Sequence, residues 1–160
     1  MAKKFAKGKS ASGRSWIEKF NEANNKGSVK KQTDKGLMYI STPKEIESII
    51  KTVPKGRLIT TKYIIDKLNK KYNVDFTCPL TTGIFVSIVA NKSEEEKSQG
   101  KKNTTPYWRV VKPPKGYLYD RYLGQESCQK ELLQSEGFKI VPSGTKKGPV
   151  VKDIDKYLLD

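Results

Sequence analysis

The sequence contains no histidine, only two cysteines and no long apolar run. Without histidine, imidazole acid–base catalysis and histidine metal ligation are excluded. Cys78 and Cys128 are too few for a disulfide framework and fit a reducing compartment, so we expect a cytoplasmic protein. No stretch approaches the roughly 18 to 20 apolar residues of a membrane span. The N-terminal lysines are not followed by the apolar segment of a secretory signal. We therefore expect no metal, no cofactor and no membrane association.

Positive charge is what the sequence has in excess. The 160 residues include 32 Lys or Arg and 17 Asp or Glu, which gives a net charge of +15 at pH 7. Such an excess is typical of proteins that bind polyanions, most often nucleic acid. The alternative is a soluble basic protein with solvated tails. The length predicts one domain with tails, and we expect a monomer.

Basic residues are concentrated at the two ends of the chain. Residues 1–36 carry ten Lys or Arg and three acids. We expect a basic, largely flexible arm over residues 1–36, with one short helix near 15–24. Its apolar cluster of Trp16, Ile17 and Phe20 either packs onto the domain or leaves the arm free to wrap onto phosphates. A domain over 37–140 and a Lys-rich tail over 141–160 follow.

Hydrophobic periodicity within residues 37–140 predicts a mainly α fold with a small β-hairpin. Ser41-Thr42-Pro43 supplies a hydroxyl cap and a first-turn proline for a helix. A short strand is expected at Leu37–Ile40. Helices are expected near 43–53, 61–72, 80–91 and 126–136, and residues 91–103 form either a polar loop or an extension of the third helix. Two short helices joined by a turn outline a helix-turn-helix, and two strands at 107–112 and 117–119 would form its wing.

Four short motifs follow one another along the chain: Val53-Pro54-Lys55-Gly56, Ile59-Thr60-Thr61, Pro106-Tyr107-Trp108-Arg109-Val110-Val111 and Leu132-Leu133-Gln134-Ser135-Glu136-Gly137. In this order and spacing they resemble the DNA-binding domain of the alkylguanine-DNA alkyltransferase (methylated-DNA–protein-cysteine methyltransferase) family. The resemblance covers about residues 43–140. It implies a winged helix-turn-helix of the alkyltransferase DNA-binding type.

The motif at 106–111 departs from the family where its chemistry resides. The family strand reads Pro-Cys-His-Arg-Val, and its Cys accepts the alkyl group while its His relays a proton. Tyr107 and Trp108 stand at these two positions. A phenol has a reference pKa near 10, and no base stands beside it. The chain is therefore most similar to the non-catalytic alkyltransferase-like members, and we expect no enzyme. The alternative is residual alkyl transfer through Cys78 or Cys128.

The resemblance also implies which residues would bind DNA. A lesion pocket would be lined by Tyr107, Trp108 and Asn91, with the two aromatic rings stacked on a flipped base. Alternatively, Tyr107 is a buried aromatic with a hydrogen-bonded hydroxyl. The third helix would enter the minor groove without the family's Arg, and the family's network carboxylate is out of register, near Lys130. The expected DNA-binding residues are Thr60, Thr61, Lys62, Thr81, Thr82, Gly83, Ser87, Arg109, Lys112 and Lys115.

These observations predict a non-enzymatic protein that binds double-stranded DNA mainly through phosphates. By analogy with alkyltransferase-like proteins, it would recognise alkylated or flipped guanine for DNA repair, with downstream repair proteins as partners. The alternative is a general nucleic-acid-binding or RNA-binding module whose pocket is vestigial.

Overall fold

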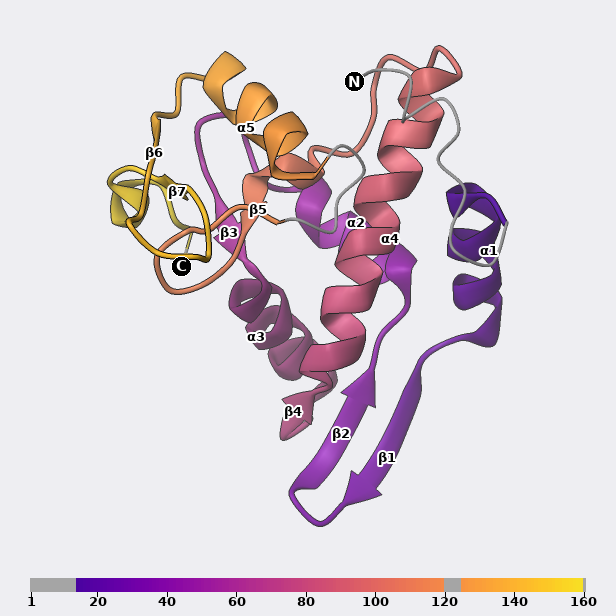
Figure 1. Cartoon of the computed structure of the whole chain (residues 1–160). Helices are drawn as coiled ribbons and strands as arrows, with labels where there is room; N and C mark the ends of the chain where they lie inside the picture. The colour runs from indigo at the N-terminus through magenta and orange to yellow at the C-terminus, as the bar shows by residue number, and fades with distance from the viewer. Residues whose placement is uncertain (1–13, 120–124, 160) are drawn as a thin grey trace.

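A computed structural model describes residues 14–119 and 125–159, and the elements of this part of the chain are short except for one helix (Figure 1). The helices are α1 (Trp16–Lys26), α2 (Pro43–Lys51), α3 (Thr61–Tyr72), α4 (Pro79–Ser98) and α5 (Gln125–Ser135). The strands are β1 (Val29–Thr33), β2 (Gly36–Ile40), β3 (Ile59–Thr60), β4 (Phe76–Thr77), β5 (Val110–Val111), β6 (Ile140–Val141) and β7 (Val150–Val151). The mainly α composition with small sheets is as the sequence predicts.

Helix α4 is the element around which the others are arranged. It is 20 residues long, and α1, α2 and α3 all pack against it. Figure 1 shows α1 and α3 on opposite sides of α4. Val86, Val89 and Ala90 are completely buried along the face that meets the other helices. Their spacing of three and four residues places them on one side of the helix.

Residues 14–36 contain helix α1 and strand β1, which both contact the rest of the domain. Ser15 caps α1 in a capping box with Glu18, which agrees with the helix expected near 15–24. Phe20 is buried against the core, and β1 pairs antiparallel with β2, with Val29 opposite Ile40. The prediction of a largely flexible arm is therefore corrected for residues 14–36, because this apolar helix face and the hairpin hold the segment on the domain. Residues 1–13 lie outside the described part of the chain.

The predicted helices at 43–53 and 61–72 are confirmed as α2 and α3. The third helix is longer than the predicted 80–91, since it continues to Ser98. The predicted strand at 107–112 is only partly correct. Residues Tyr107–Arg109 form one 3-10 turn, and β5 then pairs parallel with β3. The return at 117–119 meets this segment through a single bridge between Lys112 and Tyr117, so the expected hairpin is reduced to one pair.

The C-terminal residues complete a second apolar core. Strands β6 and β7 form an antiparallel pair, and Val151 and Ile154 are buried with Leu58 and Phe138. The Leu58 amide donates to the Tyr157 carbonyl at 2.9 Å, and the Leu58 carbonyl accepts from the Leu159 amide at 3.0 Å. The described part of the predicted tail over 141–160 is therefore integrated into the domain.

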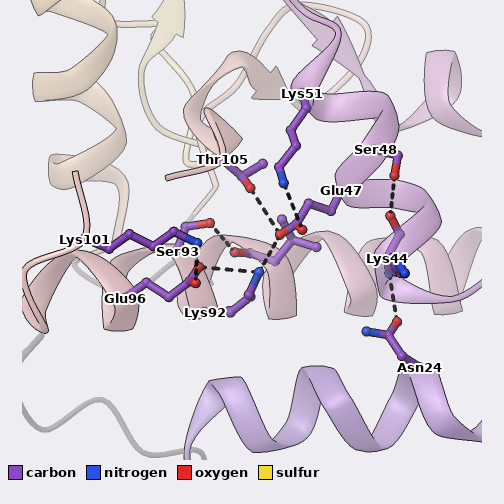
Figure 2. A network of polar contacts seen from close by, with 11 residues as sticks. Asn24, Lys44, Glu47, Ser48, Lys51, Lys92, Ser93, Glu96, Lys101 and Thr105 are labelled. Carbon is purple, nitrogen blue, oxygen red and sulfur yellow. Dashed lines mark hydrogen bonds and ion pairs between the residues drawn. The ribbon is translucent and has the colours of Figure 1, made fainter. Parts of the chain in front are cut away.

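A buried ion pair joins α4 to α2 (Figure 2). The Lys92 ammonium lies 2.8 Å from a Glu47 carboxylate oxygen and 3.4 Å from Glu96, although Lys92 and Glu47 are only 9% and 6% exposed. The Thr105 hydroxyl donates to the same Glu47 oxygen at 3.1 Å. The ammonium also lies 4.1 Å from the centre of the Phe20 ring. Three helices and the segment before β5 therefore converge on Lys92.

The surroundings of Glu47 favour its ionised form. Burial by itself would raise the pKa of Glu47, but the hydrogen bond and charge of Lys92, helped by Lys51 and Thr105, lower it below its ordinary 4.5. A lowered pKa in the folded state means that the ion pair contributes stability above the unfolded-state pKa. This contribution is lost as the pH falls through the folded-state pKa.

Replacing Glu47 with alanine should lower the free energy of unfolding by about 3 kcal/mol, because the buried Lys92 charge would keep only its longer contact with Glu96 at 3.4 Å. Urea denaturation at neutral pH measures the change. Lys62→Ala is the control, since Lys62 pairs with Asp66 on the exposed surface of α3 and its loss should cost less than about 1 kcal/mol. The difference in the free energy of unfolding between wild type and Glu47→Ala should become smaller as the pH falls below 4.5. Equal stabilities at neutral pH would contradict this role.

Candidate nucleic-acid interface

The first turns of α4 present an uncharged, solvent-facing stripe. Leu80, Gly83, Ile84 and Ser87 follow one another at helical spacing, which places them on one side of the helix. Leu80 is 71% exposed and Ile84 is 44% exposed. The opposite side, which includes Val86, is buried. We call these four residues the α4 stripe.

The backbone at the start of α4 favours a negative partner. Pro79 occupies the first turn, and Cys78 precedes it with its sulfur near the Leu80 and Thr81 amides. The first turn holds no acidic residue, so the positive end of a 20-residue helix is not neutralised there. A methyl group built at Gly83 meets nothing within 4 Å, which shows open space above the stripe. A phosphate backbone could approach the helix closely at this point.

Basic residues surround the α4 stripe in sequence and dominate the neighbouring helix. Residues 54–90 carry six Lys or Arg and two Asp. The carboxylate of Asp66 is paired with Lys62 at 2.7 Å, and that of Asp75 accepts from the Leu37 amide at 2.7 Å. The exposed lysines of α3 are Lys62, Lys67, Lys70 and Lys71. An apolar stripe beside a basic helix fits a partner that is polyanionic and has an apolar groove or edge.

The prediction that Thr82 contacts DNA is corrected. It is completely buried, and its hydroxyl donates to the Cys78 carbonyl at 2.8 Å. The physical reason is helical phase, because Thr82 lies four residues before Val86 and shares its buried face. Thr81 is half-buried and its hydroxyl lies 3.2 Å from the Cys78 sulfur. Gly83 and Ser87 are also half-buried but share the helix side of Leu80 and Ile84, and their groove contact remains a prediction.

The three residues at the start of α3 that were expected to contact DNA differ in their exposure to solvent. Thr60 is the N-cap residue, and its hydroxyl accepts from the Tyr63 amide at 3.4 Å while only 9% of the residue is exposed. Thr61 is half-buried and bonds to Tyr119. Lys62 points to solvent and pairs with Asp66. Of these three residues, Lys62 has the exposure that a phosphate contact requires.

At the acceptor position, Tyr107 is completely buried. Its hydroxyl donates to the Glu94 carboxylate, and the Cys128 sulfur lies 3.7 Å from the same hydroxyl. Burial first, and then the Glu94 charge and the Cys128 contact, raise the pKa of Tyr107 well above 10. The phenol therefore stays protonated and is no nucleophile at neutral pH.

The predicted lesion pocket is corrected at two of its three residues. Tyr107 is buried, as the alternative expectation held, and Asn91 is only 3% exposed. The ring of Tyr107 also meets Trp108 edge to face, with centroids 5.5 Å apart. Neither Tyr107 nor Asn91 offers a surface on which a flipped base could stack. The carboxylate that accepts from the Tyr107 hydroxyl is that of Glu94 on α4.

Trp108 and Arg109 share one carboxylate. The Trp108 indole donates to Glu136 at 2.8 Å, and two guanidinium nitrogens of Arg109 donate to the same carboxylate at 3.0 and 2.8 Å. A third nitrogen of Arg109 donates to the Val53 carbonyl at 2.6 Å. Arg109 is therefore held by inward contacts, and its DNA contact stays a prediction. Trp108 itself is only partly buried.

Sequence reasoning missed a buried glutamine that fixes this region. Gln129 on α5 is completely buried, yet its amide group is satisfied. Its oxygen accepts from the Tyr119 amide at 2.8 Å, and its nitrogen donates to the carbonyls of Trp108 at 3.1 Å and Val110 at 2.8 Å. A single polar side chain therefore joins β5, the 117–119 return and α5. No periodic pattern distinguishes it from its exposed polar neighbours.

The lysines expected on the wing lie in a turn. Lys115 is exposed, whereas Lys112 is half-buried with its ammonium 5.1 Å from the Tyr119 ring centre. The turn depends on Gly116, which has φ +81° and lies so close to Ile154 that an added methyl would come within 2.9 Å of that side chain. Phosphate contacts from Lys112 and Lys115 remain predictions.

The two cysteines differ in how readily they form a thiolate. Burial raises the pKa of Cys128, and the nearby Glu94 charge raises it further. Burial also acts on Cys78, but hydrogen bonds from the Thr81 side chain and from the Thr81 and Leu80 amides outweigh it and lower the pKa. Residual alkyl transfer is therefore disfavoured at Cys128, the cysteine beside Tyr107.

Neither a metal site nor a membrane span is found in the described residues. Over 14–119 and 125–159, no group of three or more acidic or cysteine side chains is arranged to hold a metal ion. No helix in these two ranges is both long and apolar enough to cross a bilayer.

Comparison with known proteins gives one remote likeness. No protein-family profile and no curated protein sequence matches the chain. Among solved structures, the chain is similar to Atl1 of S. pombe in complex with damaged DNA containing O6-carboxymethylguanine. The sequences are 17% identical, and the alignment covers 74% of this chain and 94% of that chain with a TM-score of 0.47.

Proposed function

We propose that this chain is a non-enzymatic protein that binds double-stranded DNA, built as a winged helix-turn-helix of the alkyltransferase-like type. The observation that carries the proposal is the α4 stripe, an exposed and uncharged helix face beside the basic helix α3 in a chain of net charge +15. A soluble protein gains nothing in isolation from exposing Leu80 and Ile84 one turn apart. A groove of duplex DNA between two phosphate strands would cover them.

The α4 stripe suits the minor groove, where the family resemblance would also put this helix. That groove is about 6 Å wide in B-DNA, so an approaching helix must carry small side chains. Gly83 and Ser87 are small and lie on the stripe. The amides at the start of α4 would face one phosphate strand, and the lysines of α3 would supply further phosphate contacts.

The absence of transfer chemistry follows from the closed acceptor position. The Tyr107 hydroxyl is hydrogen-bonded to Glu94 in the core, and the chain has no histidine to act as a base. Bound DNA would therefore be released unchanged. This is the behaviour of a sensor or architectural protein.

Recognition of alkylated guanine is the finer part of the proposal. Its support is the resemblance of the 106–111 motif to the family's active-site strand, together with the partial exposure of Trp108. With its Nε1 edge bonded to Glu136, the indole would offer its flat ring face to a displaced base. A lesion bound in this way would mark the site for downstream repair proteins, which are the partners we propose.

Replacing Gly83 with glutamate should weaken duplex binding at least about tenfold, because a carboxylate would face the phosphates across the α4 stripe. Fluorescence anisotropy with a labelled duplex at low salt measures the affinity. Gly83→Ala is the matched control. Its methyl group meets nothing within 4 Å and should leave the affinity nearly unchanged.

Equal affinities of wild type and Gly83→Glu would contradict the placement of α4 in the groove. An equal affinity of the wild type for single-stranded RNA would favour a general nucleic-acid-binding module instead.

A duplex containing O6-alkylguanine should bind more tightly than its unmodified twin, and the preference should survive at higher salt because it depends on base contacts. Competition anisotropy at two salt concentrations measures the preference. Intact mass of the recovered protein should show no added alkyl group. Equal affinities that fall together with salt would limit the function to lesion-independent duplex binding, and an added alkyl mass would contradict the non-enzymatic assignment.

A further inference from the structure

Large apolar side chains are seldom exposed in the described residues, and they are not evenly spread. Leu80 is 71%, Val29 is 47% and Ile84 is 44% exposed, and these are the large hydrophobic residues that stand out in residues 14–119 and 125–159. Two of the three lie one turn apart on the α4 stripe. Leu80, the most exposed, is in the first turn of the helix.

We propose that Leu80, supported by Ile84, is an apolar wedge that inserts between neighbouring base pairs of a bound duplex and unstacks them. This inference rests on the proposed function and adds how the DNA is deformed. Proteins that bind the minor groove often insert leucine, isoleucine or phenylalanine into a base step, which kinks the duplex. Segment 79–91 has no charged side chain that could occupy the base step instead.

The structure supports a wedge through the rigidity of α4. Val86 and Val89 hold the opposite face in the core, and Lys92 fixes the next turn through its pair with Glu47. Pro79 begins the helix immediately before Leu80, so the backbone that carries the wedge has little freedom. Because consecutive turns rise by about 5.4 Å, Ile84 would lie against the groove wall when Leu80 is inserted.

The wedge is also compatible with the complete burial of Tyr107. The wedge needs no pocket for a flipped base, since unstacking one step leaves both bases in the duplex. Pyrimidine–purine steps unstack most easily, so the wedge would favour sites that contain TA or CA steps. The sequence preference would therefore follow from how easily the DNA deforms.

The experiment uses a duplex with 2-aminopurine beside a central TA step, because this adenine analogue becomes more fluorescent when it is unstacked. Saturating wild-type protein should raise the fluorescence roughly twofold or more. Leu80→Ala should abolish most of the rise in fluorescence. It should also weaken binding about tenfold, since the leucine side chain that the DNA would bury is lost. Ile84→Ala should show a smaller loss. Val29→Ala, at a site on β1 that is 47% exposed against 44% for Ile84, is the matched control and should behave as wild type.

The salt dependence separates this inference from the proposed function. Leu80→Ala should leave the slope of log affinity against log salt unchanged, because no phosphate contact is removed. Wild-type binding with no rise in fluorescence, or an unchanged rise in Leu80→Ala, would overturn the wedge while duplex binding stands. A wild-type protein that does not bind the duplex at low salt would overturn both.

Discussion

The orientation of helix α4 depends on a buried charge pair. Lys92 and Glu47 are nearly inaccessible to water, and each is held by further polar contacts. An ion pair in such a place is costly unless its geometry is satisfied, so it favours the rotation of α4 against α2 that pairs Lys92 with Glu47. With that rotation fixed, Thr82 and Val86 must face the core. Leu80, two residues before Thr82, must then face the solvent.

The 3-10 turn at Tyr107–Arg109 is joined to its neighbours through two carboxylates. Tyr107 donates its hydroxyl to Glu94 of α4. Trp108 and Arg109 both donate to Glu136, the residue that follows α5. Two carboxylates that need partners when buried are therefore satisfied by three consecutive residues. Glu94 lies on α4 beyond the α4 stripe, so the helix that carries the proposed DNA-binding surface is also held by this turn.

Local signals in the sequence were sufficient to predict the positions of the helices but not to predict which residues form the candidate site. The hydroxyl cap and proline at Thr42 and Pro43 fixed the start of α2, and apolar spacing defined α3. The phase of α4 could not be read, because its exposed residues are as apolar as its buried ones. Thr82 was therefore assigned to the wrong face. Past Asn91 the sequence could not decide between a polar loop and a helix extension, since the polar residues there are buried by partners that are distant in sequence.

Nonlocal pairing explains the remaining differences. Strand β5 pairs with β3 about fifty residues earlier in the chain, and a single glutamine, Gln129, secures it from α5. Neither feature has a short-range signature. The Lys-rich C-terminal segment likewise contains few apolar residues, yet Val151 and Ile154 are enough to close the second core.

The most direct test of the account is a map of the DNA-contact surface in solution. Amide chemical shifts of the protein would be recorded by NMR while a short, unmodified duplex is added at low salt. The account predicts the largest changes at the amides of residues 80–87 and at the exposed lysines of α3. Changes confined instead to the groove between α2 and α3, which Lys44, Ile49 and Tyr63 help to line, would contradict the assignment of α4 as the DNA-binding helix.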